Sequence, residues 1–376
     1  MRNTMDGKRY YKDIDKLINY AESYHNIKGC KNNEVDFRNM GYYHGYKGYR
    51  YVYLPREGDR LNSIIIDYSD FSQLKALYDF DTNLKTLLYP YVMFVETSIK
   101  NRILESLCLL VDNPDIESVC AQLFFNKKEH NCVLNAKSNK IYNKRTNRNT
   151  SKEQISFMCK LFERVSNGYC SENVINHYFK QNKPLPIWAV FELLSLGDIR
   201  SFLDSADEEL ADVVDSYMNF KCIELTGQNN DCKCSTAHII DVIKPLRDSI
   251  AHNRAIYDVR FRQKFDRKKT NHPDQYIDNV LSILNMERDG QTYRIFDYVV
   301  FLSYVIYILN ENASSSVELL NGFRKGINCF MLNGGSTLGN GVINAILTPN
   351  VRKKINSAVL FFQTKDIKHN FNTSCR

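Results

Sequence analysis

Apolar residues recur at every third or fourth position along most of this 376-residue chain, which is the spacing of an amphipathic helix. The clearest run extends from Asp70 to Val111, with Pro90 as a candidate kink. Gly197 is expected to end an apolar helix that begins near residue 184. The same period predicts further helices over residues 10–28, 154–167, 172–181, 208–222, 275–287, 293–311, 315–332 and 343–363.

A different pattern occupies the segment from Phe37 to Tyr53, where glycines alternate with aromatic and basic residues. This alternation favours turns and a short hairpin over a helix, with a turn at 55–59 and a returning strand at 63–68. Strand patterns are almost absent elsewhere. The sequence therefore predicts a mainly α fold, in which a small N-terminal module with a β-hairpin (residues 1–69) precedes a helical domain (residues 70–376).

Residues 126–152 break the apolar pattern, because cations and asparagines dominate and Glu129 is the one acidic residue that opposes them. We expect a loop inserted into the helical domain at about this position. Two interpretations are open, a strip that follows RNA phosphates and a solvated surface loop. The candidate phosphate-binding residues of this segment are Lys127, Lys128, Lys144, Arg145 and Arg148.

Composition and charge narrow the class of protein. The chain is 43% hydrophobic and 25% charged, as in soluble globular proteins, and its net charge of +7 permits a nucleic-acid partner without requiring one. The 24 tyrosines either stack on unpaired bases or form a tyrosine-rich core. The 11 scattered cysteines and the absence of a signal-like N-terminus predict free thiols in the cytoplasm. The longest apolar stretch, Tyr298 to Leu309, is too short to span a bilayer and predicts a buried helix.

The candidate catalytic residues are Arg247 and His252, which stand five positions apart. Their helix is expected to start at Ser235 or Thr236, and Pro245 to kink or restart it. Arginine offers a permanently charged donor fork that fits phosphate, and histidine takes and gives protons near neutrality. A five-residue step turns a helix by about 140°, so the two side chains would flank a groove. Metal-free RNA cleavage also needs a second proton-transfer group, which two histidines or a homodimer would supply; the alternative is an ordinary surface histidine.

Residues around this pair suit RNA docking. Asp248, Asn253 and Arg254 are predicted to support the site. The segment that follows interleaves cations with aromatic residues, although cations near the negative end of a helix dipole would look the same. The candidate RNA-binding residues are Arg260, Arg262, Lys264, Arg267, Lys268 and Lys269 here, and Tyr43, His44, Lys47 and Arg50 near the N-terminus.

Other charged and sulfur-containing residues give weaker signals. The set Cys222, Cys232, Cys234 and His238 holds zinc-ligand types, but its Cys-x-Cys spacing is not the usual one, and we expect no metal site and no cofactor. Glu96 and Lys100 stand four residues apart on an apolar helix, which predicts an ion pair with a buried structural role.

Five short segments stand in a fixed order between about residues 37 and 260. They are residues 42–46 with 48–50, 77–81 with 84–85, 95–100, 185–188 with 192 and 195–197, and 246–248 with 251–254. Each segment alone is unspecific. Together they resemble the Abi family of bacterial abortive-infection proteins, of the AbiD/AbiF type.

The resemblance implies a HEPN-like helical bundle and maps the Arg-x4–6-His motif of metal-independent RNases onto Arg247 and His252. Asp248 stands in the polar second position, where the family more often has Asn. In active relatives the histidine serves as acid or base and the arginine stabilises the transition state, at a site formed where two copies meet. The resemblance thus implies phage defence by an RNA-binding endoribonuclease that leaves 2′,3′-cyclic phosphate ends. The alternatives are a non-catalytic protein that holds a small structured RNA and a sensor of phage components.

Overall fold

The computed structural model describes residues 13–54, 62–120, 142–206, 208–223, 234–261, 275–288 and 293–374. Side chains are not described at residues 54, 62, 142–154, 170, 208, 221–222 and 366–374. Helices dominate these ranges, and the sheet found in them is a single antiparallel pair of strands. The predicted mainly α fold is therefore confirmed.

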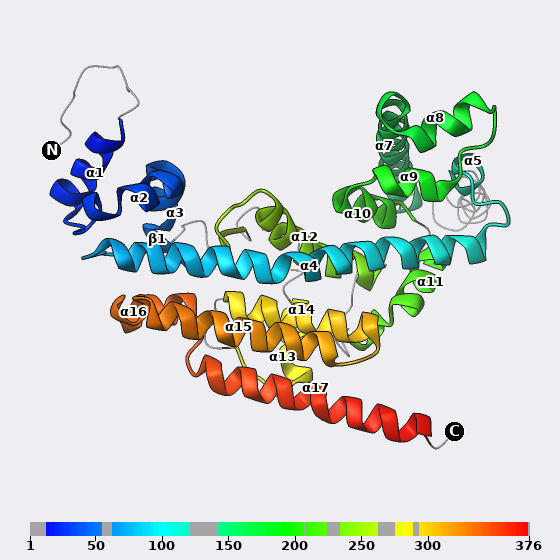
Figure 1. Cartoon of the computed structure of the whole chain (residues 1–376). Coiled ribbons are helices and arrows are strands. Elements are labelled where there is room, and N and C mark those ends of the chain that lie inside the picture. Colours follow the sequence, from blue (N-terminus) through cyan, green and yellow to red (C-terminus); the bar gives the residue numbers. More distant parts are fainter. Residues whose placement is uncertain are drawn as a thin grey trace.

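The long helix α4 (Phe71–Leu110) is the axis of the molecule (Figure 1). Asp70 starts it, because its carboxylate accepts a hydrogen bond from the Ser72 amide at 2.8 Å while the Gln73 side chain bonds back to the cap. Pro90 is exposed, and the helix continues through it. Leucine, valine and isoleucine side chains at every third or fourth position bury one face of α4, as predicted.

Three helices stack in layers along one side of α4: α14 (Ile295–Asn310), α15 (Ser314–Leu332) and α17 (Val351–Ser374) (Figure 1). Nearly all of α14 is buried, which confirms the buried helix predicted from its apolar stretch. At Gly322 an added Cβ would stand 2.6 Å from Leu87 of α4, so the close contact of α15 with α4 depends on the missing side chain. The same region holds α13 (Gln275–Ile283) and α16 (Asn340–Ile346).

On the opposite side of α4 lie α5 (Ile116–Cys120), α7 (Tyr142–Ser171), α8 (Asn173–Lys180), α9 (Ile187–Leu193) and α10 (Leu196–Ser205) (Figure 1). Helix α11 (Glu208–Met218) packs against α4 on the same side as α14, and the short 3-10 helix η4 (Phe220–Ile223) follows it. The loop predicted for 126–152 is wrong for its second half, since α7 already begins at Tyr142; residues 121–141 lie outside the described part.

The predicted helix end at Gly197 is also wrong. Helix α9 stops at Leu193, and Ser195 starts α10 through a capping box in which its backbone and side chain bond to Asp198. Gly197 therefore lies in the first turn of a new helix. A serine three residues before an aspartate was the stronger local signal.

The N-terminal module corrects the prediction for residues 37–50. This segment is helical: α2 (Glu34–Met40), the π-helix η2 (Gly41–Tyr46) and α3 (Lys47–Tyr49) follow α1 (Ile14–His25). The tyrosines at positions 42, 46 and 49 are spaced as on one helical face, and burying that face outweighs the turn preference of the glycines.

The hairpin itself is confirmed. Strand β1 (Tyr51–Leu54) pairs antiparallel with β2 (Asn62–Ile65), and Tyr51 stands opposite Ile65. The second strand is shorter than predicted, because it ends at Ile65. The turn predicted at 55–59 lies outside the described residues.

Candidate functional site

The helix that carries the motif, α12 (Ser235–Ala251), packs against α4. Its start is capped from another helix, since the Asp215 carboxylate of α11 accepts from the amides of Ser235 at 2.6 Å and Thr236 at 2.9 Å. The prediction that Ser235 or Thr236 caps the helix is therefore wrong, because a buried carboxylate from α11 satisfies these amides. The helix continues through Pro245 without a break.

The end of α12 fixes the position of His252. Asn253 adopts the left-handed conformation (φ 50°), and the Arg254 amide donates to the Ser249 carbonyl at 2.8 Å. The Asn253 amide donates to the Ile250 carbonyl at 3.1 Å, and the two bonds together form a Schellman motif. Asparagine tolerates this conformation better than most residues. His252 is thus the last residue before the turn, and its side chain is exposed.

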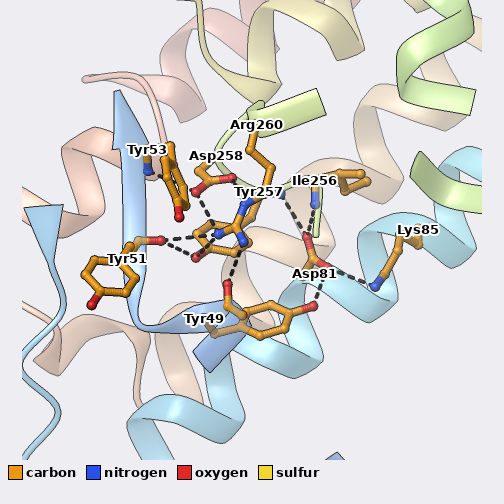
Figure 2. A network of polar contacts seen from close by, with 10 residues as sticks. Tyr49, Tyr51, Tyr53, Asp81, Lys85, Ile256, Tyr257, Asp258 and Arg260 are labelled. Atoms are coloured by element: carbon orange, nitrogen blue, oxygen red, sulfur yellow. Dashed lines mark hydrogen bonds and ion pairs between the residues drawn. The ribbon is translucent and has the colours of Figure 1, made fainter. Parts of the chain in front are cut away.

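Two charged residues of α4 hold the turn after α12 (Figure 2). The Asp81 carboxylate is fully buried and accepts from the amides of Ile256 and Tyr257, both at 2.8 Å. Lys85 forms an ion pair with Asp81 at 3.0 Å and donates to the side-chain oxygen of Asn253 at 2.7 Å. Because each buried polar group has a partner, this network fixes the turn instead of destabilising it.

The network continues into the N-terminal module through Tyr49, whose hydroxyl donates to Asp81 at 2.6 Å (Figure 2). Arg260 donates to Asp258 at 2.7 and 2.8 Å and to the Gly48 carbonyl at 2.7 Å, and its guanidinium stacks 4.8 Å from the Tyr53 ring. Arg260, a predicted RNA contact, therefore uses most of its donors to join the module to the turn. Burial raises the pKa of the Asp258 carboxyl, although Arg260 opposes this.

A pocket of about 720 Å³ opens between the N-terminal module and α12. Its walls combine residues that are far apart in the sequence. From the module come Tyr43, His44, Gly48, Tyr49 and Tyr53; from α12 come Asp241, Lys244, Pro245, Asp248 and Ser249; and from the helix end and its turn come His252, Asn253, Arg254, Ala255, Arg260 and Phe261. The pocket thus brings two histidines, three cations and several tyrosines together.

Arg247 lies outside this lining. Its guanidinium donates two hydrogen bonds to the buried Glu96 carboxylate of α4, at 2.6 and 2.9 Å, and a third to Asp248 at 2.8 Å. Lys100 adds a second cation to Glu96 at 3.2 Å, which confirms the predicted ion pair. Although burial opposes the charge, the hydrogen bonds that Arg247 donates to Glu96 raise the pKa of Arg247. The predicted pair, Arg247 and His252, is therefore split: only the histidine reaches the pocket.

Asp248 lines the pocket between two cations. Its carboxylate accepts from Lys244 at 2.6 Å and from Arg247 at 2.8 Å. Burial alone would raise the pKa of Asp248, but these two cations outweigh burial and hold the pKa below its ordinary value. The negative charge of Asp248 is therefore balanced within the protein and does not face a ligand unopposed.

The remaining predicted RNA contacts divide into residues of the N-terminal module, which are described, and residues without a described side chain. Tyr43, His44 and Lys47 are exposed, with the Lys47 ammonium 4.8 Å from the Tyr43 ring; Arg50 is half-buried beside the Tyr51 ring at 5.6 Å. Arg262, Lys264, Arg267, Lys268, Lys269, Lys127 and Lys128 lie outside the described residues, and Lys144, Arg145 and Arg148 belong to the part of α7 whose side chains are not described.

The cysteine set gives no metal site in the described part of the chain, where no group of three metal-ligand residues meets. Cys234 donates to Asp215 at 3.3 Å, and the His238 ring lies 5.1 Å from that of Tyr276. The side chains of Cys222 and Cys232 are outside the described part. Among the described helices, each is too short or too polar to cross a membrane.

Sequence reasoning missed the role of Asp81 and Lys85. They form an acid–lysine pair at i,i+4 on α4 whose acid is buried, as does Glu96 with Lys100. The sequence signal that could have found them is an acidic residue within the apolar face of a predicted helix, because a buried carboxylate needs hydrogen-bond partners. The sequence does not show which residues are those partners.

The fold and the pocket define a mainly helical protein whose candidate site lies between an N-terminal module and the end of α12. A family model described as Abi-like protein matches residues 37–258, more than half of the chain, and the chain belongs to this family. The matched range includes His44, Lys244, His252 and Arg254. The predicted Abi family is confirmed, and its broad role is abortive infection, a form of phage defence. No curated protein and no solved structure matches the chain.

Proposed function

We propose that this Abi-like protein is a HEPN-type RNA-binding protein that cleaves RNA without a metal ion, with His252 as an acid or base in the pocket. The observation that carries the proposal is the exposed His252 imidazole in a pocket that also presents cations and tyrosines. Histidine moves protons near neutrality, cations hold phosphate, and tyrosine rings stack on unpaired bases. The volume of about 720 Å³ is of the size that holds a small ligand, such as one phosphodiester with a neighbouring base.

Arg254 is the best placed cation for the phosphate. It is exposed and lines the pocket, and within the described ranges it forms no ion pair. Lys244 and Arg260 also line the pocket, but Asp248 and Asp258 already engage them. A guanidinium without a carboxylate partner can bind phosphate through two parallel hydrogen bonds.

The proposed activity is tested by incubating pure protein with cellular RNA in EDTA. We expect cleavage that leaves 2′,3′-cyclic phosphate and 5′-hydroxyl ends, and a loss of about 10²- to 10⁴-fold in His252→Ala. His177→Ala is the matched control, because His177 is an exposed histidine on α8 away from the pocket. The proposal fails if wild-type protein leaves RNA intact, or if His252→Ala cleaves as fast as wild type.

A second function, RNA binding without cleavage, is favoured by the contact between Arg247 and Glu96. The motif arginine, which the resemblance assigns to the transition state, is held by a buried carboxylate outside the pocket. In this alternative the pocket would hold a small structured RNA. Equal RNA affinity of wild type and His252→Ala, with no cleavage by either, would support it. The slope of affinity against salt would then count the phosphate contacts.

A further inference from the structure

We infer that His44 is the second proton-transfer residue of the pocket and that it works with His252 of the same chain. This inference rests on the proposed RNA cleavage. The two imidazoles come from elements more than 200 residues apart, yet both line one pocket and both are exposed. A single chain thus offers the two groups that in-line cleavage requires, without a second copy of the motif.

The π-helix η2 turns His44 toward solvent. Tyr42 and Tyr46, two positions before and after His44, are buried against the module, and His44 is left on the exposed side. Gly45 makes this turn possible, because a Cβ at that position would stand 2.8 Å from the Met40 Cβ and 2.9 Å from the Met40 carbonyl oxygen. Single π turns inside helical segments are frequent at functional sites.

The two histidines are held on elements that are tied together. His252 directly follows α12 and precedes the turn that Asp81 and Lys85 of α4 hold. The turn is joined to the module by the bond from Arg260 to Gly48, four residues after His44. Both walls of the pocket are therefore fixed to one buried network, which suits groups that must face one phosphate from two sides.

The proposed step is balanced in protons. One imidazole removes the proton of the ribose 2′-hydroxyl, whose oxygen forms a bond to phosphorus. The other, protonated, imidazole delivers its proton to the 5′-oxygen as the phosphorus–oxygen bond breaks. The products are a 2′,3′-cyclic phosphate and a 5′-hydroxyl, and Arg254 balances the charge on the phosphate oxygens.

The test compares RNA with a substrate whose 5′-bridging oxygen is replaced by sulfur. A thiolate leaves without being protonated, so loss of the general acid hardly lowers the cleavage rate of this substrate. Loss of the general base still lowers it. We expect His44→Ala and His252→Ala each to slow cleavage of ordinary RNA by about 10²- to 10⁴-fold, with RNA affinity unchanged. One of the two variants, and not the other, should recover on the sulfur substrate.

A mixing experiment distinguishes one chain from two. If both histidines of a chain serve the same pocket, a mixture of His44→Ala and His252→Ala proteins contains no intact site and stays inactive. Restored activity in the mixture would overturn the intrachain arrangement. Both variants should unfold at the urea concentration of wild type, because both side chains are exposed, and His177→Ala again serves as the control.

The other outcomes separate this inference from the proposed function. Wild-type speed in His44→Ala, while His252→Ala is inactive, overturns the role of His44 and leaves the proposed RNase standing. If His44→Ala loses RNA affinity in the same proportion as cleavage, on both substrates, His44 only binds RNA and does not transfer a proton. Absence of cleavage by wild type removes the proposed function, and the role of His44 with it.

Discussion

At the scale of single residues, the most consequential contact is the one between Arg247 and Glu96. The Glu96 side chain is 5% exposed and that of Arg247 is 21% exposed, so both charges are largely withdrawn from water. Two parallel hydrogen bonds compensate this desolvation. Arg247 therefore attaches α12 to α4, and its predicted contact with RNA stays a prediction.

Removal of one partner from this buried pair should be costly. We expect Arg247→Ala to lower the free energy of unfolding by about 3 kcal/mol, because Glu96 keeps only Lys100. Urea denaturation measures this, and a double-mutant cycle with Glu96→Gln should give strong coupling. The exposed pair of Lys16 with Asp13 is the control, where Lys16→Ala should change stability little.

The same variants separate attachment from phosphate binding. If Arg247 is a structural residue, Glu96→Gln lowers stability and does not improve RNA affinity. Tighter RNA binding by Glu96→Gln would mean that the freed guanidinium reaches the phosphate, and would contradict the structural assignment.

At the scale of elements, the end of α12 shows how a short turn fixes a functional side chain. Asn253 provides both the left-handed backbone and a side-chain acceptor for Lys85. The segment from His252 to Tyr257 then lies on α4 because two successive amides donate to Asp81. The position of His252 is thus set by residues that do not touch the pocket as well as by those that line it.

Substitutions at Asn253 distinguish its two contributions. We expect Asn253→Ala to destabilise the protein by about 2 kcal/mol or more, because alanine is strained in the left-handed conformation and the Lys85 acceptor is lost. Asn253→Gly removes the acceptor but suits the backbone, so it should cost less. Thermal or urea unfolding shows which variant is less stable. An equal loss of stability in both would mean that the backbone conformation contributes nothing.

At the scale of the whole molecule, the N-terminal module and the helical body share one polar network. Tyr49 reaches Asp81, and Arg260 reaches Gly48, across what the sequence suggested was a domain boundary near residue 69. The division into residues 1–69 and 70–376 stays a prediction. The network leads us to expect that the two parts open together.

Hydrogen exchange measures this directly. Amides in β1 and in the turn at 256–257 should have similar opening free energies. Tyr49→Phe, which removes the hydroxyl that donates to Asp81, should raise exchange in both regions. Faster exchange confined to the module would show that the two parts are independent units.

The sequence by itself determined the helical class, the family and the outward position of His252, because helical periodicity and short motifs are local properties. It failed at residues 37–50, where burial of three tyrosines outweighed the turn preference of glycine, and at residue 195, where a capping box restarted a helix. Only the tertiary structure decided that Arg247 binds Glu96 and that His44 shares a pocket with His252. Such contacts join residues 151 and more than 200 positions apart, and the cost of burying charge selects partners that local sequence does not specify.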